Sequence, residues 1–273
     1  MKGKKRTLKE IFDPIRNNYN FAQPDEELAP YVEFFSESII NDSAFSVEMF
    51  PSWTPTAYIN LGKPYSVSLD SRVHYIPAHT DILLLRDCAT IRHNPPGDCI
   101  FTIKFRPGGL EAIMGVSQLQ LKGKIFSLDK VFLPEIIDHI KTASSFNART
   151  MLAEQYLLKS KQRSVDDHYS TLVKDITDHY LQNNMQYNVS QLAEQYFITS
   201  KSINRYFHRV IGVNPKDYFS ILRTRAALTA YFDKNQLFNP CNFGYYDNSH
   251  FYKDAARFTG FPLSSVIKPL VQN

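Results

Sequence analysis

Two patterns of hydrophobic and polar positions divide the chain. From about residue 44 to residue 105, short apolar stretches of strand length alternate with turn residues. Tyr65–Leu69 alternates apolar and polar positions, as a half-buried strand does, and Pro95-Pro96-Gly97-Asp98 is a strong turn signal. The other strand candidates are residues 57–61, 81–85 and 99–105. This part of the chain predicts a small β-barrel or sandwich.

Beyond Gly109 the pattern changes to helical spacing. Residues 110–114 have helical character, and from Pro134 onward nearly every segment does. Residues 159–164 are polar and lack apolar anchors, which indicates a linker. The sequence therefore predicts an α+β multidomain protein, with a β-rich barrel or sandwich and trailing helices in residues 1–160 and an all-α domain in residues 165–273.

Composition fits this division. A chain of 273 residues suggests two domains, and 43% hydrophobic with 21% charged residues excludes wholesale disorder. No stretch approaches ~18 consecutive apolar residues, and polar sequence follows the basic N-terminus, so we expect a cytoplasmic protein without a membrane span. Three cysteines without a Cys-x-x-Cys pair argue against a disulfide framework and a cysteine-rich zinc site.

The net charge of +4 lies entirely in the C-terminal part. Residues 160–273 carry 13 basic and 9 acidic residues, whereas residues 1–159 carry 18 of each. A basic domain beside a neutral one suggests a polyanion as its partner. An excess of four charges is also within ordinary scatter, so charge alone does not decide for nucleic acid.

A helix-turn-helix pattern lies between residues 189 and 212. A short helix over Val189–Tyr196 and a longer one over Ser200–Ile211 are separated by Phe197-Ile198-Thr199. Thr199 or Ser200 provides an N-cap, and Gly212 stands where a C-cap glycine belongs. These lengths have helix-turn-helix proportions.

The second of these helices is amphipathic in a way that suits DNA reading. Lys201, Asn204, Arg205 and His208 recur at spacings of three to four and share one face, opposite the apolar face of Ile203, Phe207, Val210 and Ile211. Arg and Lys can donate to guanine edges, and Asn can bond adenine with two hydrogen bonds. The alternative is an ordinary solvated helix surface.

A second unit follows at a suitable distance. Asn214-Pro215 begins a helix that is predicted to run to about Lys234, and residues 244–251 introduce another turn and helix. This last helix presents Asn248, Ser249, His250 and Lys253. A linking helix of ~20 residues would span ~30 Å, close to the ~34 Å turn of B-DNA, so both reading helices could enter successive major grooves.

These residues resemble the double helix-turn-helix DNA-binding domain of the AraC family of transcription regulators. The resemblance covers about 100 residues, from Tyr169 to Lys268. Its most specific segments are Leu192-Ala193, Ser202–Phe207, Gly212–Tyr218, Leu222–Leu228, Gly244–Phe251 and Phe258–Gly260. Phe105–Leu110 with Met114–Val116 is similar to the β-rich domain that precedes this module in one branch of the family.

The resemblance implies roles for individual residues. Lys201, Asn204 and Arg205 fall on base-reading positions of the first unit, and Arg223 and Arg225 match basic positions of the linking helix, where they could equally pair with carboxylates. The predicted DNA-binding set is Ser200, Lys201, Asn204, Arg205, His208, Asn248, Ser249, His250 and Lys253, with Lys216, Arg223 and Arg225 as candidate contacts to the DNA backbone.

The second unit departs from the family pattern. Asn239-Pro240 stands where Ile-Ala is usual, and proline is tolerated only in the first turn, so the supporting helix must start late or be distorted. Ala255 replaces a core phenylalanine, and Pro262 sits one residue early. In the first unit, Phe197 occupies a turn position where glycine is common. The first reading helix is therefore the stronger candidate.

Two other functions compete with this interpretation. One is a metal- or small-molecule-binding β-barrel, because His74, His79 and His93 lie in the strand region, although their spacing fits no tight ligand motif. The other is a nonspecific or degenerate DNA binder, which the altered second unit suggests and which predicts salt-sensitive binding without sequence preference. The sequence contains no recognisable catalytic set, and we predict neither enzyme activity, nor a metal, nor a cofactor.

The architecture suggests a regulatory role for the N-terminal domain. We expect it to bind an unknown small-molecule effector, to mediate homodimerisation, or both. Six aromatic residues could line a pocket there, although aromatics at alternating strand positions are more often core: Trp53, Tyr58, Tyr65, Tyr75, Phe101 and Phe105. The expected function is a sequence-specific regulator of transcription, activator or repressor, that binds double-stranded DNA.

Overall fold

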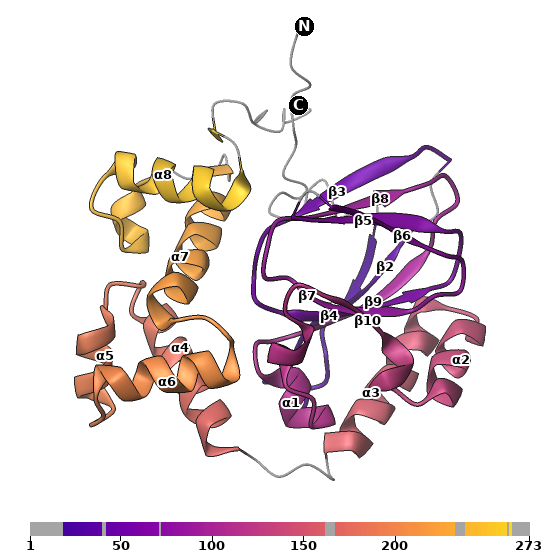
Figure 1. Ribbon diagram of the computed structural model, residues 1–273, viewed down its shortest axis with the longest axis horizontal. Helices are drawn as coiled ribbons and strands as arrows, with labels where there is room; N and C mark the ends of the chain where they lie inside the picture. The colour runs from indigo at the N-terminus through magenta and orange to yellow at the C-terminus, as the bar shows by residue number, and fades with distance from the viewer. Residues whose placement is uncertain are drawn as a thin grey trace, which may run out of the picture.

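The computed structural model describes residues 19–39, 42–70, 72–161, 167–232, 238–260 and 262–263. Within these ranges, nine strands come first, two short helical elements precede a tenth strand, and the remaining helices follow; Figure 1 shows the strands and the C-terminal helices side by side. The predicted α+β fold is confirmed. The polar segment 159–164 is helical as far as Lys161, and the rest of it lies outside the described residues, as does Lys234.

The β domain consists of two antiparallel sheets. The six-stranded sheet has the order β1-β2-β9-β4-β7-β10 and the four-stranded sheet the order β3-β8-β5-β6. The first comprises β1 (Tyr19–Ala22), β2 (Val32–Ser38), β9 (Ile100–Phe105), β4 (Pro55–Asn60), β7 (Ile82–Leu85) and β10 (Ile125–Ser127). The second comprises β3 (Phe45–Met49), β8 (Thr90–Asn94), β5 (Tyr65–Leu69) and β6 (Arg72–Ile76).

The four predicted strands correspond to β4, β5, β7 and β9. Strands β4 and β9 are buried at every residue because both faces of the six-stranded sheet are covered. β5 alternates buried and half-buried positions, as its sequence predicts. Between the sheets lies a hydrophobic cluster that includes Val47, Tyr58, Val67, Leu84 and Ile100.

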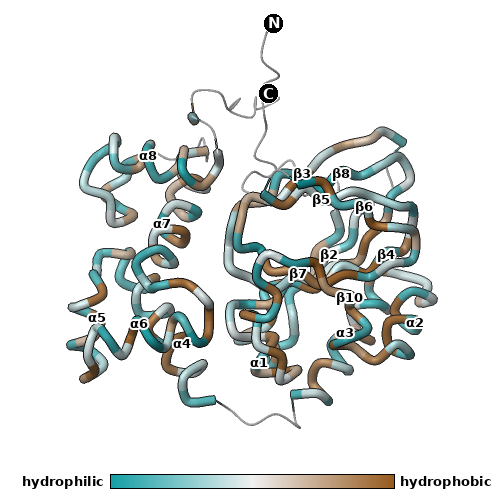
Figure 2. The backbone as a smooth tube through the Cα atoms, viewed as in Figure 1, coloured by the Kyte–Doolittle hydropathy of each residue, from teal (hydrophilic) through white to brown (hydrophobic). Residues whose placement is uncertain are grey.

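Short helices cover the other face of the six-stranded sheet (Figure 1). The ring of Phe146, at the start of α3 (Phe146–Lys161), lies 6.1 Å from that of Phe101 in β9. Figure 2 shows hydrophobic stretches concentrated in the strands of this sheet. The helical elements are α1 (Gly109–Met114), η2 (Gln118–Leu121), η3 (Leu128–Lys130), α2 (Pro134–Thr142) and α3 (Phe146–Lys161).

The C-terminal domain contains only helices among its described residues. They are α4 (His168–Gln182), α5 (Val189–Gln195), α6 (Ser200–Val210), α7 (Pro215–Phe232), η4 (Pro240–Phe243) and α8 (Asn248–Thr259). These bounds agree with the predicted helices to within one or two residues where both are described. No helix of the described residues is long and apolar enough to cross a membrane.

Candidate nucleic-acid interface

The first helix-turn-helix unit is formed by α5, a short turn and α6. Asn188 and Gln191 form a capping box at the start of α5. Thr199 caps α6 by accepting a hydrogen bond from the backbone N–H of Ser202 at 3.1 Å. In the turn, Phe197 adopts φ 52° and its side chain is 96% exposed, so this position has the left-handed conformation that favours glycine.

The inner face of α6 is anchored in the core of the domain. Ile203, Phe207 and Val210 are buried, and the ring of Phe207 lies 5.3 Å from that of Phe219 in a T-shaped contact. Phe219 in turn stacks on Tyr180 of α4 at 4.2 Å. These contacts fix the rotation of α6 about its own axis and therefore determine which side chains point outward.

The outer face of α6 carries the predicted reading residues. Lys201, Asn204, Arg205 and His208 are all exposed, whereas Ser200, at the first position, is half-buried. Asn204 Nδ2 donates to the carbonyl of Ser200 at 3.3 Å, and the Arg205 guanidinium lies over the ring of Tyr206 at 5.2 Å. The structure thus places four potential donors on one solvent-facing surface.

The two arginines of the linking helix α7 are half-buried and paired with carboxylates. Arg223 donates to Asp254 of α8 at 2.9 Å and to the carbonyl of Gly244 at 3.2 Å, and it lies over the ring of Tyr245 at 4.2 Å. Arg225 pairs with Glu33 of the β domain at 3.2 Å. Of the three candidate backbone contacts, Lys216 is the exposed one.

The second unit shows the distortion that its proline predicts. Its supporting element, η4, is a 3-10 turn that begins at Pro240 and is capped by Asn239. Asp247 caps α8 by accepting from the N–H of His250 at 2.7 Å. The outer face of α8 exposes all four predicted residues, which are Asn248, Ser249, His250 and Lys253.

Aromatic residues form the core of the second unit. Ala255 is fully buried on α8, one turn from Phe251. The ring of Phe251 lies 4.8 Å from Phe238, 5.5 Å from Tyr245 and 5.7 Å from Tyr231. Aromatic volume in this unit is thus supplied by residues from α7 and the turn as well as by α8.

A cleft of about 720 Å³ lies between the two units and is lined by α5, α7 and α8. Lys216, Arg257 and His250 are exposed around it. Arg257 pairs with Asp217 at 3.0 Å. Exposed basic side chains therefore occur between α6 and α8 as well as on them, with Arg257 paired to a carboxylate.

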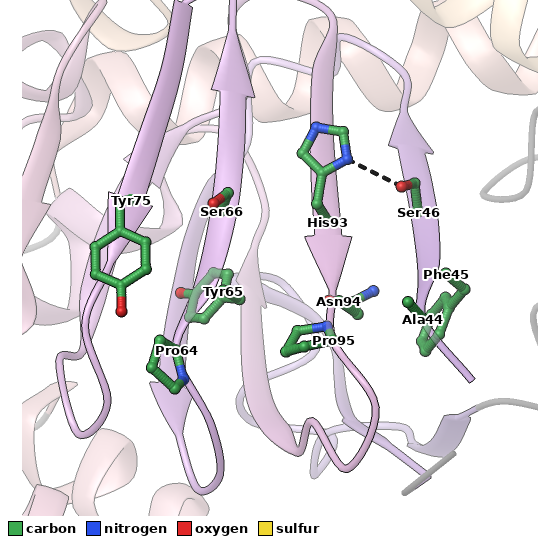
Figure 3. Close-up of a pocket in the computed structure, with 10 residues that line it drawn as sticks. All are labelled: Ala44, Phe45, Ser46, Pro64, Tyr65, Ser66, Tyr75, His93, Asn94 and Pro95. Atoms are coloured by element: carbon green, nitrogen blue, oxygen red, sulfur yellow. Dashed lines mark hydrogen bonds between the residues drawn. The ribbon is translucent and has the colours of Figure 1, made fainter. Parts of the chain in front are cut away.

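A groove of about 420 Å³ lies on the four-stranded sheet of the β domain (Figure 3). Tyr65 and Tyr75 line it, together with His93, which is hydrogen-bonded to Ser46 at 2.9 Å and to Ser68 at 3.0 Å. Of the six aromatics named as candidate pocket residues, five are buried in the core and only Tyr75 is exposed; the buried ones are Trp53, Tyr58, Tyr65, Phe101 and Phe105. His74 and His79 are exposed and do not line this groove.

The sequence does not reveal the contacts between the two domains. Glu33 of β2 reaches Arg225, and Gln118 of η2 donates to the carbonyl of Ile211, at the end of α6, at 2.8 Å. Neither residue belongs to a recognisable motif, and each lies about a hundred or more residues from its partner, so a local pattern carries no signal for this contact.

Comparison with known proteins gives matches in structure but not in sequence. No protein-family model and no curated protein matches the chain. ToxT from Vibrio cholerae is similar with a TM-score of 0.47 and 9% identity, over 84% of this chain and 96% of that one. ToxT bound to an unsaturated fatty acid is similar with a TM-score of 0.43 and 8% identity, over 82% of this chain and 94% of that one. CuxR, an AraC-like transcriptional activator, is similar with a TM-score of 0.32 and 12% identity, over 80% of this chain and 88% of that one.

Proposed function

We propose that the chain is a sequence-specific, DNA-binding transcription regulator of the AraC type. The observation that supports this most directly is the outer face of α6, where Lys201, Asn204 and Arg205 are exposed on a helix whose rotation is fixed by buried aromatics. A helix that follows a tight turn and carries Arg, Lys and Asn outward meets the requirements for reading major-groove base edges.

The second unit supports binding to two sites on one duplex. α6 and α8 lie at opposite ends of α7 (Figure 1), and the 18 residues of α7 span roughly 27 Å at 1.5 Å per residue. This length is comparable to the ~34 Å pitch of B-DNA. The polar surface of α8 would therefore read a second half-site about one helical turn from the first.

Charge favours the same partner. Lys216 is exposed beside the cleft between the two units, where a phosphate backbone would pass between successive grooves, whereas Arg257 is paired with Asp217. Arg223 and Arg225 are paired with carboxylates, so we assign them to holding α7 in place and not to the DNA.

We assign regulation to the β domain, by binding a small effector, by forming a homodimer, or by both. The groove on the four-stranded sheet is a candidate effector site, since the exposed Tyr75 and the half-buried Phe45 line it together with the polar residues Ser66 and His93 (Figure 3). A fatty acid is the ligand of one ToxT structure, which makes fatty acids a natural first class to screen.

The test is selection of bound fragments from the source genome at low and near-physiological salt. A shared motif that survives the higher salt supports the proposal, whereas fragments without a common motif that dissociate as salt rises would make the chain a nonspecific binder. Arg205→Ala should then reduce discrimination by about 1–3 kcal/mol for each base that the Arg205 side chain reads.

Arg209→Ala is the matched control. Arg209 lies on the same helix but pairs with Asp167 at 3.4 Å and covers the ring of Tyr169 at 4.8 Å. Its removal should leave the selected motif unchanged. If Arg205→Ala and Arg209→Ala alter specificity equally, α6 does not read bases through Arg205.

A further inference from the structure

The side chain of Gln118 joins the two domains. It is fully buried, its Oε1 accepts from the N–H of Gly108 at 2.8 Å, and its Nε2 donates to the carbonyls of Trp53 at 3.2 Å and Ile211 at 2.8 Å. Two of these partners belong to the β domain and the third ends α6, the first reading helix. Through Gln118, the end of α6 is therefore tied to two backbone groups of the β domain, and removing the Gln118 side chain would break all three hydrogen bonds.

Close packing of backbone against side chains surrounds this hydrogen-bonded junction. A methyl group at Gly212 would lie 2.6 Å from Leu119 and 3.1 Å from Trp53, and one at Gly108 would lie 2.9 Å from Val210. At these two glycines the backbone of each domain thus packs directly against side chains of the other. Contact of this kind resembles the interior of a single domain and leaves little room for α6 to move relative to the β domain.

The linking helix is held at a second point. Glu33 of β2 lies between two cations, with Oε1 3.2 Å from Arg225 of α7 and Oε2 3.1 Å from Lys104 of β9. Lys104 is 1% exposed, so this ion pair is shielded from solvent on the β-domain side. Removing the charge of Glu33 would leave a buried lysine without its carboxylate.

The second reading helix has a contact of its own with the β domain. Near the end of α8, the ring of Phe258 lies 5.9 Å from that of Phe50, which follows β3. The β domain therefore touches α6, α7 and α8, which are the three helices whose arrangement sets the distance and angle between the two reading surfaces.

We propose that Gln118 and Glu33 are positioning residues for DNA recognition, through which the β domain holds the two helix-turn-helix units at one fixed spacing. The proposal rests on the function proposed above and adds a specific consequence. The chain reads two half-sites at one spacing, and loosening either contact broadens the accepted spacings without altering the bases that each helix reads.

A fixed spacing raises the effective concentration of α8 at the second half-site once α6 is bound. Once α6 is bound, binding of α8 is intramolecular, and its strength depends on how closely the unbound arrangement matches the spacing of the two half-sites. A rigid connection avoids the entropic cost of ordering the second unit on the DNA. The same rigidity penalises a duplex with base pairs inserted between the half-sites.

The experiment uses two single variants of the full chain, Gln118→Ala and Glu33→Gln. Glu37→Gln is the matched control, because Glu37 lies on the same strand but pairs with Arg149 of α3 within the β domain at 3.1 Å. Affinity is measured for a single half-site, for two half-sites at the selected spacing, and for two half-sites with inserted base pairs. We expect the advantage of two half-sites over one to fall about tenfold in both variants, and single-site affinity to stay within about twofold of wild type.

A measurement without DNA separates this proposal from the proposed function. Spin labels at Gln195→Cys and Asn242→Cys, both exposed positions, report the distance between the two units in a background where Cys241 is replaced by Ser. Wild type and Glu37→Gln should give one narrow distance distribution, and Gln118→Ala or Glu33→Gln a broad one. Equally narrow distributions in all four proteins overturn the proposal, even if sequence-specific binding is found.

The DNA results then test the function on their own. A wild-type chain without sequence preference refutes the proposed function but leaves the distance measurement decisive for the positioning role. If Gln118→Ala does not fold, as judged by circular dichroism, Glu33→Gln decides the matter alone. Sequence-specific binding with unchanged spacing preference in Glu33→Gln would show that this residue does not position the helices.

Discussion

Two glycines in the C-terminal domain allow one prediction to be made quantitatively. Gly244, which ends η4, and Gly260, which ends α8, have nearly the same left-handed conformation, with φ 73° and 75°. Alanine costs about 1–2 kcal/mol in this conformation because its Cβ crowds the adjacent carbonyl oxygen. On backbone conformation alone, Gly244→Ala and Gly260→Ala should be equally destabilising.

Their surroundings differ sharply. A Cβ at Gly260 would have no heavy atom within 4 Å, whereas one at Gly244 would lie 2.3 Å from the carbonyl oxygen of Met185 and 3.1 Å from its carbonyl carbon. Met185 is not free to retreat, because it is buried, has φ 59° and donates its N–H to the carbonyl of Tyr180 at 2.9 Å. Overpacking against such a segment typically adds about 1–3 kcal/mol.

The expected total is therefore about 2–5 kcal/mol for Gly244→Ala and about 1–2 kcal/mol for Gly260→Ala. Urea unfolding of the full chain, followed by circular dichroism, measures both decreases in unfolding free energy against wild type. The larger decrease at Gly244 reports how tightly the second helix-turn-helix unit packs on the loop between α4 and α5. Equal decreases in the two variants would refute the close approach of Gly244 to Met185.

Two further predictions concern ionisable groups. Burial alone would raise the pKa of Glu33 from 4.5, but the nearby charges of Lys104 and Arg225 lower it to about 2. The ionised Glu33 side chain therefore stabilises the fold fully above pH 4.5, and this stabilisation disappears as the pH falls toward 2. The unfolding free energy of wild type should fall on the order of 3 kcal/mol further than that of Glu33→Gln over this range, and parallel acid denaturation curves would contradict this. Burial, and then Glu37, raise the pKa of the Cys99 thiol to about 11. At neutral pH, iodoacetamide should therefore label the exposed Cys241 well before Cys99, and equal labelling rates by mass spectrometry would contradict that assignment.

The sequence predicts the helical domain well because its signals are local. The spacing of Ile203, Phe207 and Val210 determines which face of α6 is buried, and Thr199 and Gly212 mark its ends within a few residues of chain. The distortion at Pro240 is likewise local, since a missing amide hydrogen is a property of that residue. Features of this kind are visible without knowledge of the remaining fold.

The sequence predicts the fold of the β domain less completely. β4, β5, β7 and β9 are apparent as strands, but their order in the sheets depends on pairings such as β4 with β9, whose partners lie about forty residues apart. The sequence pattern does not predict β2, although Val32 and Phe35 are fully buried. Its sequence, Val-Glu-Phe-Phe-Ser-Glu-Ser, contains two carboxylates, Glu33 and Glu37, that the fold pairs with Arg225 and Arg149. Only these distant partners make its charges compatible with burial.

Gly212 shows how local and long-range requirements meet in one residue. Its position after α6 predicts a left-handed C-cap, and the structure confirms this with φ 98° and an N–H bond to the carbonyl of Phe207 at 3.0 Å. A capping glycine tolerates asparagine at modest cost. Here a Cβ would lie 2.6 Å from the Leu119 side chain and 3.1 Å from the Trp53 ring of the β domain, so any side chain would require these groups to shift. The sequence predicts the cap but not the close packing of Gly212 against the β domain. This packing connects the end of α6 to the β domain. A regulatory signal that reaches the proposed DNA-binding surface through this junction would therefore depend on residues that no DNA-binding motif contains.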